Sequence, residues 1–124
     1  MISSLRVLIV DDDQFVRAVL RDMLTPTGCE CSEARDGLEA LERVRADRPD
    51  VVLLDLLMPK MSGIEALQQI CGLSPRPRVV VITSLASDAL LAQALSAGAS
   101  AYVVKPFHPI EIQEAVRQAM RADA

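Results

Sequence analysis

Aromatic residues are nearly absent from this chain of 124 residues, which holds one tyrosine, two phenylalanines and no tryptophan. Because 51% of the residues are nonetheless hydrophobic, the expected core is aliphatic. Basic residues are not in excess either, since the formal net charge is −4 at pH 7. An acidic chain lacks the positive surface that nucleic acids require, so we expect no direct binding of nucleic acid.

Histidine and cysteine are too few for a zinc site. His108 is the only histidine, and Cys29, Cys31 and Cys71 contain no Cys-x-x-Cys pair, so we expect reduced thiols. Long hydrophobic runs are missing as well, because none approaches the roughly 20 residues of a membrane span. The N-terminus has no signal-peptide organisation. We therefore expect a protein that acts in the cytoplasm without membrane contact.

Four short hydrophobic runs each lead directly into a polar residue. Val51-Val52-Leu53-Leu54 leads into Asp55. Four consecutive apolar residues are too short for a helix and are typical of a strand buried on both faces of a parallel sheet. The other runs are Val7–Val10 before Asp11-Asp12-Asp13, Val79–Ile82 before Thr83-Ser84, and Ala101–Val104 before Lys105-Pro106.

Helical spacing of apolar residues separates these strands. A shorter, more polar strand at Cys29–Ala34 is expected at a sheet edge, and Leu38, Leu41 and Val44 are expected to point inward from the second helix. The helices are expected at 14–24, 38–46, from about 63, from 87 or 88 to 97, and 109–121. This alternation predicts one α/β domain over residues 1–124, a doubly wound parallel sheet with helices on both faces. Periodicity alone does not predict the strand order.

The carboxyl ends of parallel strands meet at one edge of a sheet, which is where ligand sites form. We therefore expect the carboxylates of Asp11, Asp12 and Asp55 to converge. Two carboxylates about 4 Å apart repel by roughly 4 kcal/mol at an effective dielectric constant near 20. Such a cluster tends to hold a proton or a cation. Because every ligand is an oxygen, the sequence predicts a hard cation such as Mg²⁺.

Lys105 and Thr83 add an ammonium group and a hydroxyl to the same edge. A carboxylate is a competent nucleophile toward phosphorus, and nearby positive charge neutralises the oxygens of a phosphoryl group in transfer. The predicted chemistry is phosphoryl transfer to Asp55, with an aspartyl phosphate as product. Asp13 is expected mainly as an N-cap of the following helix.

Five short motifs occur in order along the chain: Val10-Asp11-Asp12-Asp13, Leu54-Asp55 followed by Met58-Pro59 and Gly63, Thr83-Ser84, Gly98-Ala99, and Lys105-Pro106-Phe107. As a set, they make the chain resemble the receiver domain of two-component response regulators over essentially its whole length. The resemblance implies a flavodoxin-like fold with strand order 2-1-3-4-5 and a cis peptide between Lys105 and Pro106.

The resemblance also implies the roles of the site residues. It makes Asp55 the phosphorylation site, Asp11 and Asp12 the metal-binding acids, and the Leu57 carbonyl a further metal contact. Thr83 and Lys105 would contact the phosphoryl group, and Tyr102 would swing inward when Thr83 shifts. The donor would be a phosphohistidine on a sensor histidine kinase or phosphotransfer protein. Tyr102 as an ordinary core tyrosine remains an alternative.

The segment Ser87–Val104 has Asp88 as its only charge and more leucines than one buried stripe needs. This pattern predicts that the fourth helix, fifth strand and fifth helix form an apolar docking face for a partner protein or a second copy. Scattered exposed leucines are the alternative.

Leu57 and Leu85 take positions where many relatives have polar residues, which predicts slow hydrolysis of the phosphoryl group.

Two other functions compete with a phosphorylation switch. A pseudo-receiver would use the fold only to bind proteins, but all five site residues are present here. An aspartyl-phosphate phosphohydrolase usually has a second acid two residues after the nucleophile, and here that residue is Leu57. We therefore expect a signalling module that phosphorylates itself from a donor and dephosphorylates slowly, rather than a metabolic enzyme.

Overall fold

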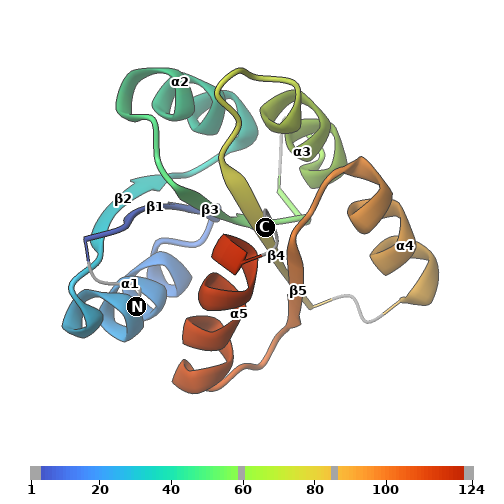
Figure 1. Cartoon of the computed structure of the whole chain (residues 1–124). Coiled ribbons are helices and arrows are strands. Elements are labelled where there is room, and N and C mark those ends of the chain that lie inside the picture. Colours follow the sequence, from blue (N-terminus) through green and yellow to red (C-terminus); the bar gives the residue numbers. More distant parts are fainter. Residues whose placement is uncertain (1–3, 59–60, 85–86, 122–124) are drawn as a thin grey trace.

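The computed structural model describes residues 4–58, 61–84 and 87–121, in which strands and helices alternate (Figure 1). The strands are β1 Arg6–Val10, β2 Glu30–Ala34, β3 Val51–Asp55, β4 Arg78–Thr83 and β5 Ala101–Val104. The helices are α1 Gln14–Leu24, α2 Gly37–Asp47, α3 Gly63–Cys71, α4 Asp88–Ala97 and α5 Pro109–Arg121, with a short 3-10 turn, η1, at Thr25–Thr27.

The five described strands form one parallel sheet in the order β2-β1-β3-β4-β5. Both the parallel pairing and this order confirm the prediction, including the edge position of the polar strand β2. The central strand β3 is buried at all five residues, as expected for a strand covered on both faces. Asp55, at its carboxyl end, is therefore held between β1 and β4 in the middle of the sheet edge.

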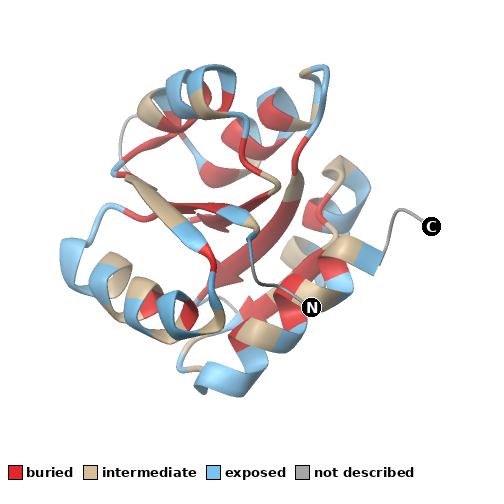
Figure 2. Cartoon of the chain, turned by 60° about the vertical axis from the view of Figure 1, so that its left-hand side comes forward, coloured by how far each residue is buried: buried red, intermediate tan, exposed pale blue. Residues whose placement is uncertain are grey.

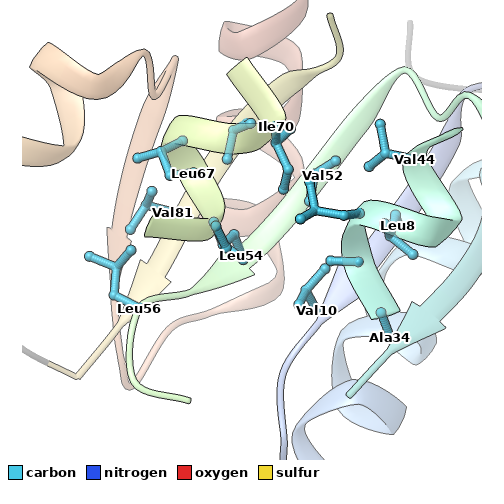
Figure 3. Close-up of a cluster of buried hydrophobic side chains, with 14 of the residues drawn as sticks. Leu8, Val10, Ala34, Val44, Val52, Leu54, Leu56, Leu67, Ile70 and Val81 are labelled. Carbon is cyan, nitrogen blue, oxygen red and sulfur yellow. The ribbon is translucent and has the colours of Figure 1, made fainter. Parts of the chain in front are cut away.

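Helices cover both faces of the sheet (Figure 1). On one face, α2, α3 and α4 bury an aliphatic cluster against the strands, in which Leu54, Leu67 and Val81 lie close together (Figure 3). On the other face, α1 and α5 cover a second cluster that includes Ile9, Leu53 and Ile112. Buried residues follow the strands and the inner sides of the helices (Figure 2). The core is aliphatic, as the composition predicted.

Short polar side chains begin four of the helices. The side chains of Asp13, Asp36, Ser62 and Ser87 each accept a hydrogen bond from a backbone N–H in the first turn of α1, α2, α3 and α4, respectively. Caps of this kind stabilise a helix by about 1 kcal/mol. The predicted N-cap role of Asp13 is thereby confirmed, so its carboxylate is already used within the acidic loop.

The prediction for Leu38 was wrong. Its side chain is 52% exposed, whereas Leu41 and Val44 are buried as expected. The buried stripe of α2 begins at Gly37 and continues through Ala40, which leaves position 38 one step off the stripe.

Two further predictions concern single residues. The Lys105–Pro106 peptide is cis, and all three cysteines are free thiols. Across the described ranges, we find no helix with both the length and the apolar character needed to cross a bilayer.

Candidate functional site

Asp55 is the last residue of β3, and the residue is only 5% exposed. Hydrophobic neighbours on β1 and β4 remove it from water, since Val10 pairs with Leu54 and Ile82 pairs with Asp55 in the sheet register. One carboxylate oxygen, Oδ1, accepts a hydrogen bond from the backbone N–H of Leu57 at 3.1 Å. This bond orients the group and leaves Oδ2 directed toward the other charged residues.

The loop after β1 supplies the second and third carboxylates. Asp11 is 2% exposed; its backbone N–H donates to the Ala34 carbonyl at 3.1 Å and its Oδ1 accepts from the Asp13 N–H at 2.9 Å. Asp12 is exposed, and Asp13 accepts from the Phe15 N–H at 2.8 Å as the cap of α1. The loop therefore holds Asp11 inside the site and Asp12 at its rim.

The structure brings the predicted acids together. Asp11, Asp12 and Asp55 each offer a carboxylate oxygen, and these oxygens lie within 4.8 Å of one another. Lys105 comes from the end of β5, and its Nζ lies 3.1 Å from Asp11 Oδ2 and 3.4 Å from Asp55 Oδ2. Residues far apart in the sequence thus form one cluster of three carboxylates and one ammonium group, as predicted from the strand ends.

Burial and like charge both act on this cluster. Burial is the main cause that raises the pKa of Asp55, with the charge of Asp11 adding to it, while the Leu57 N–H and Lys105 oppose the rise. Burial lowers the pKa of Lys105, but the hydrogen bond to Asp11 and the charges of Asp55 and Asp11 together raise it above its ordinary value. Lys105 therefore stays positively charged at neutral pH and partly compensates the acids.

The donor set fits a hard divalent cation. Three carboxylates supply only oxygen ligands, and one ammonium group cannot balance three negative charges at this spacing. Mg²⁺ takes one or two carboxylates directly and keeps several waters, so the exposed Asp12 at the rim is compatible with such an ion. Within the described residues, the sulfur and imidazole ligands preferred by softer metals do not join this cluster.

Thr83 and Tyr102 lie on β4 and β5, which are adjacent strands. Thr83 ends β4, is fully buried, and directly follows Ile82, the sheet partner of Asp55. Its place at the carboxyl edge next to β3 agrees with the prediction. Tyr102 lies within β5 and is half-buried against the cluster on the α4 side of the sheet, and burial raises its pKa. The structure thus places the two residues on adjacent strands, Thr83 at the site edge and Tyr102 further from it.

The two leucines expected beside Asp55 have different outcomes. The Leu57 side chain is 49% exposed, so its side chain lies on the surface while its backbone N–H serves Asp55. Leu85 lies outside the described residues, as does Pro59 of the motif that follows Asp55. Slow loss of the phosphoryl group therefore stays a prediction.

Arg17 is a contributor to the site that the sequence did not single out. Its Nη1 donates to the backbone carbonyl of Asp11 at 2.6 Å and its Nε donates to Glu33 at 2.9 Å. Arg21, one turn further along α1, holds the other oxygen of Glu33 at 2.8 Å. The pair Arg17 and Arg21 at helical spacing was a weak signal of such a network, but the carbonyl acceptor has no signature in the sequence.

Replacing Glu33 by glutamine is expected to lower the free energy of unfolding at neutral pH by about 1 kcal/mol, since partial exposure screens the ion pairs. Burial alone would raise the pKa of Glu33, but hydrogen bonds from Arg17 and Arg21 lower it below its ordinary value of 4.5. A carboxyl with a lowered folded pKa stabilises the protein above that ordinary value and ceases to do so as the pH falls through the folded pKa.

Urea unfolding of both proteins at several pH values measures this difference. The gap between wild type and Glu33→Gln should be largest near pH 7 and close in acid. Asp47→Asn is the matched control, because among the described residues Asp47 makes a single, longer ion pair, 3.7 Å from Arg43. A gap for Glu33→Gln that does not change with pH would contradict the expectation.

Known proteins share both the sequence pattern and the fold. The response regulator receiver domain family matches residues 7–117. The chemotaxis protein CheY of Thermotoga maritima is 40% identical over 114 residues, which cover 91% of this chain and 95% of the relative. Response regulator MprA of Mycobacterium tuberculosis is 38% identical over 118 residues, 95% of this chain but 51% of MprA. A CheY-like response regulator receiver domain protein from Methanospirillum hungatei JF-1 has a crystal structure with a TM-score of 0.89 and 30% identity, covering 96% of this chain and 95% of that one.

Proposed function

This chain belongs to the response regulator receiver domain family, and on that premise we propose that it is a phosphoacceptor switch of a two-component system. The phosphoryl group would come from a histidine kinase or phosphotransfer protein and pass to Asp55. The observation that supports this most directly is the contact of Lys105 with both Asp11 and Asp55 beside the third acid, Asp12. Members of this family are signalling proteins rather than classical enzymes.

In the proposed reaction, an oxygen of Asp55 attacks the phosphorus of a phosphohistidine. The P–N bond breaks, its electron pair stays on the imidazole nitrogen, and that nitrogen takes up a proton. Lys105 and the Thr83 hydroxyl would contact oxygens of the phosphoryl group, where negative charge is concentrated. The Leu57 N–H holds one Asp55 oxygen at 3.1 Å, which leaves the other oxygen as the nucleophile.

Asp11, Asp12, Asp55 and the backbone carbonyl of Leu57 would hold Mg²⁺. When bound, the ion supplies positive charge to the phosphoryl oxygens. The protein's part is to keep the acids close together before the ion arrives, although burial, and after it the charge of Asp11, raise the pKa of Asp55. Arg17 supports this arrangement by binding the Asp11 carbonyl.

The proposed output is a change in partner binding at the face formed by α4, β5 and α5. Phosphate on Asp55 would draw Thr83 inward and free space for Tyr102. The face exposes apolar side chains: Leu95 is 49%, Val104 36% and Ile110 70% exposed. Between β5 and α5, a groove of about 620 Å³ has Tyr102 and Val104 on one wall and Ile110 on the other. These exposures support the docking face predicted from the sequence.

Intact-mass spectrometry after incubation with acetyl phosphate and Mg²⁺ tests the proposal. The wild-type protein should gain about 80 Da, the mass of one phosphoryl group, and the gain should be lost in Asp55→Asn and without Mg²⁺. Circular dichroism on the same samples establishes that both proteins are folded. An unmodified mass for folded wild-type protein would favour a pseudo-receiver that only binds partners.

A further inference from the structure

A basic groove lies at the edge of the sheet opposite Asp55. It is formed where the chain enters β3 and β4, so Asp50 and Arg78 are at this edge while Asp55 and Thr83 end the same strands at the other. Two adjoining hollows of about 180 and 200 Å³ share Val44, Arg48 and Pro75 as lining residues. The groove therefore runs between the last turn of α2 and the connection from α3 to β4.

The charge of this groove is opposite to that of the chain. Arg45, Arg48, Arg76 and Arg78 line it, whereas the net charge of the protein is −4. Asp50 is the acid among the lining residues, and its Oδ2 accepts the backbone N–H of Arg6 at 2.9 Å. Four arginines among the lining residues of the two adjoining hollows, against one acid, make this part of an acidic chain locally positive.

Arg48 occupies a backbone conformation that disfavours an arginine. Its φ is 48° and its ψ is 62°, the left-handed region, at the C-cap of α2. The C-cap residues of η1 and α4 also have the left-handed backbone conformation, and both are glycines, Gly28 and Gly98. A side chain in this region costs roughly 1–2 kcal/mol, which glycine would avoid. Within the described part of the chain, no hydrogen bond or ion pair of the Arg48 guanidinium offsets this cost.

Compensation of the dipole of α2 explains only two of the four arginines that line the groove. Cations near the last turn of α2 interact favourably with its carbonyls, which accounts for the charge of Arg45 and Arg48. It does not account for Arg76 and Arg78, which belong to the connection into β4. One Arg76 nitrogen, Nη2, donates to the Gly98 carbonyl at 2.9 Å, and a guanidinium has four further N–H groups to offer.

We propose that this groove binds an organic phosphate. Guanidinium groups pair with phosphate oxygens through short, charge-assisted hydrogen bonds, and Arg48 stands at the junction of the two hollows to make them. Val44, Leu73 and Pro75 provide an apolar wall for the organic part of the ligand. Pro49, Pro75 and Pro77 restrict the backbone on both sides, so the site is formed in advance. The phosphate would belong to a soluble nucleotide or to a lipid headgroup.

Three phosphate probes test this site, two of them through amide chemical shifts of the 15N-labelled chain. The soluble probes are adenosine monophosphate and inorganic pyrophosphate, and sedimentation with vesicles containing phosphatidic acid tests the headgroup source against neutral vesicles. Saturable shifts at Val44–Asp50 and Leu73–Arg78, with the Asp11 and Asp55 amides unmoved, would support a soluble ligand. Sedimentation with the phosphatidic acid vesicles alone would support a headgroup.

Arg48→Gly is the decisive variant. Glycine adopts the left-handed region without strain, so this variant should lose the guanidinium and still fold. Binding should weaken about tenfold or more, the loss expected for a charge-assisted hydrogen bond. Arg43→Gln is the control: it removes an equal charge from α2 at a residue that pairs with Asp47 outside the groove, and it should bind as wild type does.

Three results would overturn the proposal. They are the absence of saturable binding for every phosphate probe, unchanged binding by Arg48→Gly, and saturation by a glutamate-rich peptide when no phosphate probe binds. The titration is repeated on Asp55→Asn, which should bind the probes as wild type does because the groove lies at the opposite edge. The outcome is therefore separable from the proposed phosphorylation of Asp55.

Discussion

Replacing Gly63 by alanine is expected to cost about 3 kcal/mol or more of unfolding free energy. An ideal Cβ at this residue would lie 2.2 Å from Leu56 Cα and 2.7 Å from both the carbonyl carbon and oxygen of Leu56. These are backbone atoms, which cannot rotate away as the end of a side chain can. The Gly63 N–H also donates to the Leu56 carbonyl at 3.1 Å, and a displaced backbone would lose that bond.

Urea unfolding followed by circular dichroism measures this loss, with Gly72→Ala as the matched control. The Cβ added at Gly72 would meet its nearest atoms at 3.5 and 3.6 Å, ordinary contact distances. Its φ of −84° suits any residue, so alanine there should leave stability unchanged or raise it by up to about 1 kcal/mol. Similar unfolding midpoints for the two variants would contradict the close approach of Gly63 to Leu56.

The close approach matters for the site because Leu56 directly follows Asp55. The hydrogen bond that orients the Asp55 carboxylate comes from Leu57, the next residue along. A shift of Leu56 would therefore move both the nucleophile and its donor. The glycine in the motif was visible in the sequence, but its reason, a backbone contact with a residue seven positions earlier, required the structure.

Much of the fold was predictable because its elements depend on local patterns. Runs of four hydrophobic residues predicted β1, β3, β4 and β5, and the helix expected from residue 87 or 88 to 97 is α4, Asp88–Ala97. The strand order came only from the resemblance to receiver domains, since periodicity does not say which strands are neighbours. Leu38 was misplaced because a stripe shifted by one residue has nearly the same period.

The acidic cluster was predictable for a different reason. Parallel strands bring their carboxyl ends to one edge, so Asp11, Asp55 and Lys105 were expected at the same edge once the strands were recognised. The support for the cluster was not predictable, because Arg17 binds a backbone carbonyl that every residue possesses. The left-handed backbone of Arg48 was hidden as well, since glycine, the usual marker of that conformation, is absent there.

Replacing Lys105 by methionine is expected to slow phosphorylation of Asp55 by about 100-fold, the usual effect of removing a group that stabilises charge in a transition state. Methionine has a similar length but no charge, so the Asp11 and Asp55 oxygens now 3.1 and 3.4 Å from Nζ would lose their cation. Binding of Mg²⁺ should not weaken, because removal of a positive charge leaves the acids more attractive to a cation.

The prediction separates two quantities, because the rate of phosphorylation should fall while the affinity for Mg²⁺ should not. Time courses of phosphoprotein mass with acetyl phosphate measure the rate, and isothermal calorimetry measures Mg²⁺ affinity. Arg117→Met is the matched control, since it removes the same charge from the surface of α5, and Lys105→Arg asks whether charge alone is enough. If Lys105→Met phosphorylates at the wild-type rate, Lys105 does not act on the phosphoryl group. If it loses Mg²⁺ binding and phosphorylation together, the ammonium group instead holds the acidic site in shape.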